Sequence, residues 1–191
     1  LEAFRKLGAV TRQDGEVISC TVEKDGEETI ALPYPSVGAT ENVVLYSVLR
    51  KGKTELLNVA KEPEIIELCD FLRNMGANIS GDGGSRITIY GVRELHGTTY
   101  RLKTDRIAFL TYAAMTAATG GSAYFRVYGD TFQQEKKYLL RAGCEIKEDP
   151  EGVSVSCENG IKAVPYIKTG PYPEFPTDAQ SLFLLKRITI N

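Results

Sequence analysis

Apolar and polar residues follow two alternating periods along the chain, and these periods predict its helices and strands. Between residues 62 and 75 the apolar positions recur at helical spacing and share one face. Pro63 is tolerated in the first turn of such a helix, and Gly76 favours the left-handed conformation that ends one. The apolar face of this predicted helix consists of Ile65, Ile66, Cys69, Leu72 and Met75.

The segments beside this helix predict a further helix and several strands. Residues 42–49 are an apolar run that ends in two basic residues and a glycine, as is typical of a helix terminus. Residues 53–59 alternate loosely and predict a strand. Residues 78–80 and 86–90 are separated by a glycine-rich turn and predict a hairpin. The pattern therefore predicts an α-β-α-β-β unit, preceded by a short strand.

The same unit recurs along the chain. Gly8, Gly76 and Gly143 each belong to a similar segment and lie 68 and then 67 residues apart. The first copy begins inside its second helix and the last stops soon after Asp178, so the sequence predicts an internal piece of a longer array. The change from helix to strand at residues 184–188 comes too early for the repeat. The second full copy is predicted to contain helices at 107–118 and 131–142 and strands at 122–127, 145–147 and 153–157.

Composition narrows the class of protein without identifying it. The 191 residues are 42% apolar and 25% charged, and 23 basic residues stand against 25 acidic ones, so the chain lacks the basic excess of a nucleic-acid binder. No apolar run is long enough to span a bilayer, and no signal peptide is recognisable. The sequence therefore indicates a cytoplasmic protein with no nucleic-acid or membrane partner.

Cysteine and histidine usage argues against a metal or a cofactor. The four cysteines form no CxxC pair and are expected to be reduced, half-buried thiols. His96 is the only histidine, which excludes a histidine-rich metal site. No dinucleotide-binding fingerprint is present, so neither a metal nor a cofactor is expected. The cysteines are Cys20, Cys69, Cys144 and Cys157.

Four motifs in this repeat resemble the enolpyruvyl transferase family. Residues 36–42 (Ser-Val-Gly-Ala-Thr-Glu-Asn) resemble the nucleotide-sugar loop of members that use UDP-N-acetylglucosamine, and residues 58–65 resemble the stretch before the next helix. Residues 103–107 resemble the crossover between lobes, and residues 175–180 resemble the segment with the catalytic aspartate. The resemblance implies an α/β fold in which repeated βαβαββ units build an inside-out α/β barrel in each of two lobes.

The resemblance also implies how this chain is divided and what the parent protein does. Residues 1–103 would be part of the first lobe and residues 104–191 part of the second, so that both lobes are incomplete here. The implied reaction transfers the enolpyruvyl group of phosphoenolpyruvate to the 3′-hydroxyl of UDP-N-acetylglucosamine, a step in the synthesis of peptidoglycan precursors. In that reaction the hydroxyl oxygen attacks C2 of phosphoenolpyruvate, C3 is protonated and phosphate leaves.

By this resemblance Asp178 is the catalytic residue that accepts the hydroxyl proton, and Thr177 beside it belongs to the substrate-binding set. Asp178 heads an apolar run, so we expect it at a helix N-terminus, where the macrodipole favours its ionised form. The alternative is that Asp178 only caps this helix, because aspartate is a preferred N-cap residue.

The segment Tyr34, Pro35, Ser36, Val37 and Gly38 is implied to contact the UDP portion of the substrate. Its small residues and glycine would let backbone N–H groups at a helix start approach a diphosphate. The alternative is an ordinary helix capped by the serine. Tyr34 stands where many relatives carry a lysine, a change that would preserve backbone contacts but remove an ionic one.

Arg106 matches an arginine of the crossover motif and is implied to bind substrate. The alternative is a structural arginine that pairs with Asp105 or with a neighbouring loop. The next residues, 108–110, are Ala-Phe-Leu and replace a more polar, glycine-containing stretch of typical members. This departure leaves open a non-catalytic member that serves as a nucleotide-sugar binding or interaction scaffold.

The resemblance further implies that part of the active site lies elsewhere in the parent chain. None of the four cysteines matches the family's loop cysteine, and the basic residues that hold phosphoenolpyruvate come from other segments. The remainder of the parent chain is therefore an expected partner, and the isolated chain is expected to show no turnover. A piece of the shikimate-pathway enolpyruvyl transferase is a further alternative, which the motifs at residues 36–42 and 62–65 disfavour.

Overall fold

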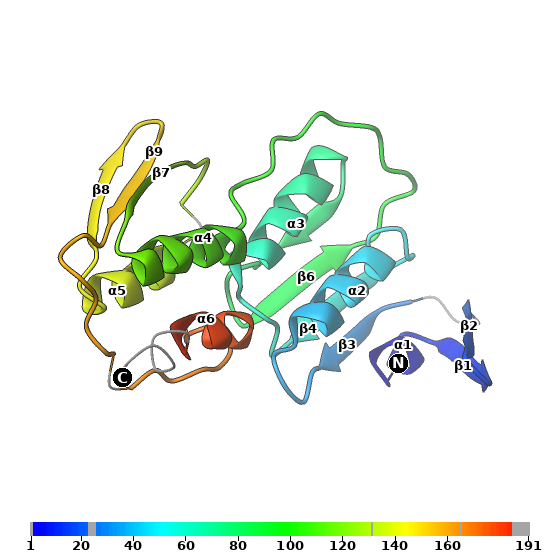
Figure 1. Ribbon diagram of the computed structural model, residues 1–191. Coiled ribbons are helices and arrows are strands. Elements are labelled where there is room, and N and C mark those ends of the chain that lie inside the picture. Colours follow the sequence, from blue (N-terminus) through cyan, green and yellow to red (C-terminus); the bar gives the residue numbers. More distant parts are fainter. Residues whose placement is uncertain (1, 23–25, 131, 165, 185–191) are drawn as a thin grey trace. The chain divides into compact units, whose positions relative to one another are not determined.

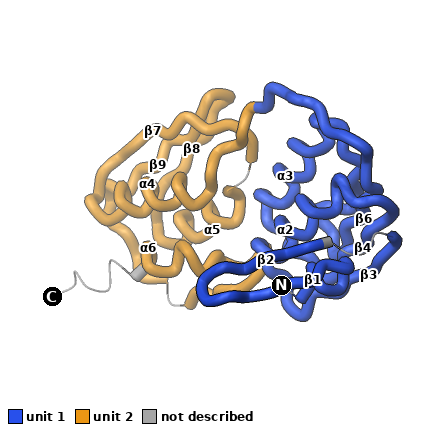
Figure 2. Tube along the Cα trace, turned by 90° about the vertical axis from the view of Figure 1, so that its right-hand side faces the viewer, with its two compact units in different colours: residues 1–100 blue, residues 101–191 orange. Residues whose placement is uncertain are grey.

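Two units make up the chain, Leu1–Tyr100 (unit 1) and Arg101–Asn191 (unit 2), which Figure 2 colours separately. The helix-to-strand change predicted at residues 184–188 lies, from residue 185 on, outside the described residues. The assignment of residues 1–103 and 104–191 to two barrel lobes stays a prediction. The computed structural model describes residues 2–22, 26–130, 132–164 and 166–184.

Unit 1 combines a β-hairpin with a four-stranded sheet and its helices (Figure 1). Its elements are α1 (Glu2–Lys6), β1 (Ala9–Asp14), β2 (Val17–Val22), β3 (Glu28–Ala31), α2 (Val37–Ser47), β4 (Lys53–Leu57), α3 (Pro63–Asn74), β5 (Asn78–Ser80) and β6 (Arg86–Tyr90). The sheet order is β3-β4-β6-β5. Strands β3 and β4 are parallel, and α2 supplies the crossover that a parallel pair needs, whereas β6 is antiparallel to both neighbours.

Helix α3 confirms the helix predicted from apolar spacing. Its buried residues are Ile65, Cys69 and Leu72, and burial raises the pKa of the Cys69 thiol to about 12. Pro63 occupies the first turn, and Gly76, with φ of 99°, follows the C-cap in the left-handed conformation. The predicted hairpin is also confirmed, because β5 pairs with β6 in antiparallel register.

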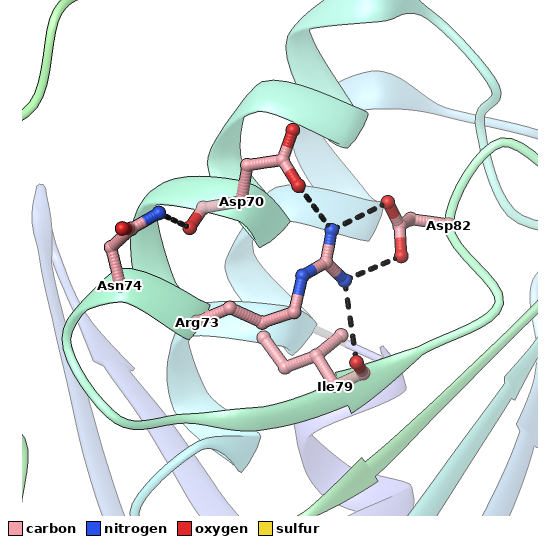
Figure 3. A network of polar contacts seen from close by, with 5 residues as sticks. All are labelled: Asp70, Arg73, Asn74, Ile79 and Asp82. Carbon is pink, nitrogen blue, oxygen red and sulfur yellow. Dashed lines mark hydrogen bonds and ion pairs between the residues drawn. The ribbon is translucent and has the colours of Figure 1, made fainter.

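Arg73 ties the end of α3 to the turn between β5 and β6 (Figure 3). Its Nη1 and Nη2 donate to Asp82 Oδ1 and Oδ2 at 2.7 and 3.0 Å, a bidentate pair. Nη2 also donates to Asp70 Oδ1 at 2.5 Å, and Nη1 donates to the carbonyl of Ile79 at 3.3 Å. The hydrogen bond from Arg73 is the main reason why the pKa of Asp82 lies below its usual range.

Unit 2 repeats this plan. Its elements are α4 (Arg106–Thr119), β7 (Ser122–Arg126), α5 (Gln133–Arg141), β8 (Glu145–Asp149), β9 (Gly152–Ser156), the 3-10 helix η1 (Thr177–Ala179) and α6 (Gln180–Leu184). The sheet order β7-β9-β8 matches β4-β6-β5 of unit 1, and every pair in it is antiparallel. The internal repeat predicted from the sequence is therefore present in the structure.

Two helices begin two or more residues away from the predicted position, whereas α4 begins at Arg106, one residue before the predicted start. Helix α2 starts at Val37 rather than at residue 42, because the Ser36 side chain caps it before the apolar run begins. Helix α5 starts at Gln133 rather than at residue 131, and Thr131 itself lies outside the described residues. Within the described part of the chain, no helix is both long and apolar enough to cross a membrane.

Each unit has a hydrophobic core of its own. In unit 1 one cluster of buried residues includes Val44 of α2, Leu56 of β4 and Ile87 of β6, and α2 packs against both strands. In unit 2 the core is partly aromatic, because the ring of Phe109 lies 4.4 Å from that of Phe132 and 5.4 Å from that of Phe125, measured between centroids. Burial of such side chains contributes roughly 1.5–3 kcal/mol each.

Candidate functional site

Ser36 sits at the start of α2, in the connection that follows β3. Its backbone is extended (φ −87°, ψ 126°), and its Oγ accepts a hydrogen bond from the N–H of Ala39 at 3.3 Å. The serine-capped helix weighed as an alternative is therefore observed. The N–H groups of Val37 and Gly38 lie in the first turn, where a helix offers no internal acceptor. The serine cap uses the N–H of Ala39, so the N–H groups of Val37 and Gly38 are left for an anion.

Two polar side chains hold this loop in place, and the sequence analysis included both in its motifs without giving either a role. Thr40 is fully buried, and its Oγ1 donates to the Ser36 carbonyl at 2.8 Å and accepts from the N–H of Ala60 at 3.1 Å. Asn58, in a left-handed conformation with φ of 56°, donates from Nδ2 to the carbonyl of Leu32 at 2.8 Å. The loop is consequently fixed at both ends to the segment after β4. The Asn-Val-Ala sequence at 58–60 was a possible signal.

The residues of the loop itself present an open surface. Tyr34 is 58% exposed, Pro35 and Val37 are partly buried, and Gly38 is exposed. A Cβ added at Gly38 would meet no atom of the described residues within 4 Å, so the turn has open space on that side. Bare backbone next to open space at a helix N-terminus suits the close approach of an anion.

Glu41 is the nearest carboxyl group to this helix start along the chain. Burial, followed by the charge of Glu64, raises the pKa of the Glu41 carboxyl above its ordinary value. Glu64 stands in the first turn of α3, so acidic side chains approach one another where the two helices begin. The shift reflects the partial burial of the Glu41 carboxyl and its interaction with this second carboxyl group.

In unit 2 Asp178 projects from η1 with an exposed side chain. The N-cap of this turn is Pro176 and makes no side-chain hydrogen bond, so the capping role considered for Asp178 is not what the geometry gives. The Asp178 side chain makes no hydrogen bond or ion pair within the described ranges. The carboxylate is therefore available to a ligand. Thr177, in the same turn, is also exposed.

Apolar contacts on either side of Asp178 hold the turn in place. Phe175 and Ala179 are both fully buried. The ring of Phe175 lies 4.6 Å from that of Tyr138 and 5.1 Å from that of Phe183. Backbone hydrogen bonds from Gly170 to Phe175, and from Phe175 to Lys168, add a second restraint. Asp178 is therefore held in position by buried residues on both sides while its carboxylate remains exposed.

Arg106 begins α4 and is buried, with only 7% of its side chain exposed. Its Nη1 donates to Oε1 of Glu135 on α5 at 2.8 Å, and Glu135 is fully buried. Asp105 does not pair with this arginine but serves as the N-cap of α4. Its carboxylate accepts from the N–H groups of Ile107 and Ala108 at 2.8 and 3.1 Å. The structure thus places the Arg106 guanidinium on Glu135.

The candidate residues fall into two groups. Tyr34, Pro35, Ser36, Val37 and Gly38 lie in unit 1, whereas Arg106, Thr177 and Asp178 lie in unit 2, where α4 packs against η1 and α6. Among the described residues, no group of three or more histidine, cysteine or acidic side chains is placed to hold a metal ion. The candidates are therefore a helix start in one unit and an exposed acid in the other.

A model of the EPSP synthase (3-phosphoshikimate 1-carboxyvinyltransferase) family matches residues 1–191, the whole of the chain. The chain belongs to this family. The resemblance to enolpyruvyl transferases is thereby confirmed. UDP-N-acetylglucosamine 1-carboxyvinyltransferase 2 of Caldanaerobacter subterraneus is 39% identical over 94% of the chain. UDP-N-acetylglucosamine 1-carboxyvinyltransferase of Gluconacetobacter diazotrophicus is 42% identical over 96% of it.

The family fold is equally evident in solved structures. The crystal structure of the enolpyruvyl transferase NikO from Streptomyces tendae matches 96% of this chain and 47% of its own, with a TM-score of 0.80 at 20% identity. The predicted α/β fold of the enolpyruvyl transferases is therefore confirmed. The chain spans only 43% and 44% of the length of the two curated relatives. The activity of a complete enolpyruvyl transferase can therefore be assigned to this protein only as a proposal.

Proposed function

We propose that the complete protein transfers the enolpyruvyl group of phosphoenolpyruvate to the 3′-hydroxyl of UDP-N-acetylglucosamine. The observation that carries this proposal is the similarity of five curated relatives, all named UDP-N-acetylglucosamine 1-carboxyvinyltransferase. They are 38–42% identical over at least 94% of the chain. A match of that extent includes both groups of candidate residues.

Asp178 would act as the general base. It would take the proton of the sugar hydroxyl as that oxygen attacks C2 of phosphoenolpyruvate, and C3 would be protonated before phosphate leaves. An exposed carboxylate without a partner in the described chain suits this role, because its lone pairs remain open to a substrate hydroxyl. Thr177 would contact substrate from the same turn.

The segment Tyr34 to Gly38 would hold the UDP portion. The N–H groups of Val37 and Gly38, together with the positive end of the α2 macrodipole, would bind the diphosphate. Ser36 keeps the helix start ordered by capping it. The buried pairing with Glu135 favours an indirect role for Arg106, in which it fixes the start of α4 beside the substrate.

The proposed reaction also implies a cellular process and a compartment for the protein. Its product is a peptidoglycan precursor, so the protein would serve cell-wall biogenesis, and through it cell shape and cell division, in a bacterial cytoplasm. Free cysteines, three of them buried, agree with a reducing compartment. The remainder of the parent chain, with phosphoenolpyruvate and the nucleotide sugar, would be its partners. Nucleic acid and membrane are not expected among them.

Two other functions each have an observation in their favour. The name of the family model favours a shikimate phosphate as acceptor. The apolar residues at 108–110 favour a non-catalytic scaffold, although Phe109 and Leu110 are buried in the core of unit 2 and Ala108 is exposed. Their burial gives the departure from the family pattern a packing reason that requires no loss of activity.

The deciding experiment offers both acceptors to the polypeptide encoded by the complete gene. Phosphate release and product mass are measured with phosphoenolpyruvate plus either UDP-N-acetylglucosamine or 3-phosphoshikimate. Turnover of phosphoenolpyruvate with UDP-N-acetylglucosamine, and none with 3-phosphoshikimate, supports the proposal. Turnover with 3-phosphoshikimate would transfer the assignment to the other pathway. Binding of the nucleotide sugar without turnover would favour the scaffold.

A further inference from the structure

A cavity of about 670 Å³ opens in unit 2, outside the residues of the proposed reaction. Three segments form its walls: the residues that precede α4, the end of β7, and the turn between β8 and β9. The side chains that matter for its chemistry are Arg101, Leu102, Thr104, Arg126, Tyr128 and Glu151. All of them belong to unit 2, and none is among the residues proposed to bind UDP-N-acetylglucosamine or phosphoenolpyruvate.

Paired hydrogen bonds fix the floor of this cavity. The N–H of Thr104 donates to the carbonyl of Tyr128 at 2.8 Å, and the N–H of Tyr128 donates to Thr104 Oγ1 at 2.7 Å. The guanidinium carbon of Arg101 lies 4.0 Å from the centroid of the Tyr128 ring, a cation–π contact. The Tyr128 ring thus positions the Arg101 guanidinium, and the Tyr128 backbone is itself fixed by its hydrogen bonds with Thr104.

The cavity concentrates positive charge in a chain whose net charge is −2. Arg126 is the last residue of β7, two positions before Tyr128, and both residues line the cavity. Within the described ranges, no carboxylate comes within 4 Å of the guanidinium nitrogens of Arg101 or Arg126. Two guanidinium groups therefore line one cavity and have no ion-pair partner among the described residues.

The remaining walls set limits on the ligand. Leu102 is 72% exposed, and Val127 and Pro150 add further apolar surface. Glu151 also lines the cavity and opposes a large anion, although the neighbouring Asp149 carboxylate is occupied by the Tyr124 hydroxyl and by the N–H groups of Glu151 and Gly152. A small charge attached to a flat apolar body fits these walls better than a bare polyanion.

We propose that this cavity binds a small aromatic phosphate, with the phosphate on Arg101 and Arg126 and the ring against Leu102 and Tyr128. Guanidinium groups form bidentate hydrogen bonds with phosphate, and a guanidinium already held on a ring loses little freedom when it does so. The residues of this site are not those of the proposed reaction. It would give the protein a means of responding to a metabolite that is neither donor nor acceptor.

Titration of the 15N-labelled chain, followed by amide NMR, tests the site. Phenyl phosphate is the probe, with inorganic phosphate and benzyl alcohol as its charged and apolar halves. We expect phenyl phosphate to shift the amides of residues 101–104 and 126–128 and to bind about tenfold more tightly than inorganic phosphate. The Arg101→Ala and Arg126→Ala variants should each weaken binding about tenfold, which corresponds to roughly 1.4 kcal/mol.

Lys147→Ala is the matched control, because Lys147 is an exposed cation on β8 of the same sheet and does not line the cavity. It should leave binding unchanged. Both arginines are exposed, so an unchanged amide spectrum in the remainder of unit 2 shows that each variant is folded. Equal affinity in the arginine variants, shifts confined to other residues, or no advantage of phenyl phosphate over inorganic phosphate would overturn the proposal.

Discussion

Arg106 and Glu135 form an ion pair inside unit 2, with Nη1 2.8 Å from Oε1 and side chains that are 7% and 0% exposed. The two residues are 29 positions apart and join the first turn of α4 to the first turn of α5. Oε2 of Glu135 is buried and accepts no hydrogen bond from the described residues. The carboxylate therefore depends strongly on this one arginine for compensation of its charge.

Removal of the carboxylate should be costly. Glu135→Ala leaves the guanidinium of Arg106 buried without this counter-charge, and loss of one partner of a buried pair typically costs about 3–5 kcal/mol. The free energy of unfolding, measured by urea denaturation, should fall by that order. Glu174→Ala breaks the exposed pair with Lys168 and serves as the control, for which little change is expected. Equal losses of unfolding free energy in the two variants would show that the buried pair stabilises the fold no more than the exposed pair does.

Replacement of both partners should be far milder than replacement of one. In Arg106→Met with Glu135→Leu, neither charge of the pair is left in the core, and such exchanges are often neutral. The double variant should therefore be more stable than Glu135→Ala. If the double variant also loses turnover in the complete enzyme while it remains folded, Arg106 contributes to the site as well as to stability.

Acid should weaken the contact between Arg73 and Asp82. The pKa of Asp82 is lowered in the folded state, chiefly by the hydrogen bond from Arg73, so its stabilising effect is present above the unfolded pKa of about 3.9 and disappears as pH falls through the lower folded value. Asp82→Asn should reduce the unfolding free energy at pH 7 by roughly 0.5–1 kcal/mol, allowing for solvent screening. Once the pH lies below the folded-state pKa of Asp82, the variant and the parent should converge. A pH-independent difference would assign the effect to shape rather than to charge.

Thr40 offers a test of how the loop at residues 34–38 is held. Thr40→Val leaves the buried N–H of Ala60 without its acceptor, and an unsatisfied buried donor costs about 1–3 kcal/mol. Thr116→Val, at a partly exposed threonine of α4 that bonds only to its own helix, is the control and should cost less than about 0.5 kcal/mol. Similar values for the two variants would mean that the link from Thr40 to Ala60 does not anchor the loop.

Thiol chemistry should distinguish the cysteines. Cys20 is exposed on β2, whereas Cys69, Cys144 and Cys157 are buried, and burial raises the pKa of Cys69 to about 12. A thiol reagent at pH 8 should modify Cys20 alone in the folded chain and all of the cysteines in denaturant. The Cys20→Ser variant should show no rapid reaction. Fast modification of two or more thiols in the folded chain would contradict the burial of the other three.

Local patterns predicted much of the fold. The spacing of apolar residues around Ile65 and Cys69 identified α3. Gly76 located the end of this helix, and the glycines within residues 81–84 located the turn of the next hairpin. These signals could be recognised because they depend only on neighbouring residues. Apolar periodicity alone placed the start of α2 too late, because the serine cap precedes the apolar run and contributes nothing to its periodicity, whereas the alternative of a serine-capped helix gave the start correctly.

Contacts between distant residues could not be predicted in this way. Thr40 meets Ala60 twenty positions away, and Glu135 is buried only because Arg106 reaches it from another helix. A charged residue alone gives no sign that it will be enclosed. For the candidate site, the resemblance supplied Ser36 and Asp178, whereas the structure supplied the reasons why one is ordered and the other exposed.

The Asp178→Asn variant of the complete polypeptide tests the central claim most directly. The side chain is exposed and supports no hydrogen bond in the described chain, so the variant should unfold like the parent. Its kcat for enolpyruvyl transfer to UDP-N-acetylglucosamine should nevertheless fall by about 10²–10⁴. Asp14→Asn, at an exposed aspartate of the β1–β2 hairpin, should retain full activity. A stable Asp178→Asn variant that turns over at the parent rate would contradict the assignment of Asp178 as the general base.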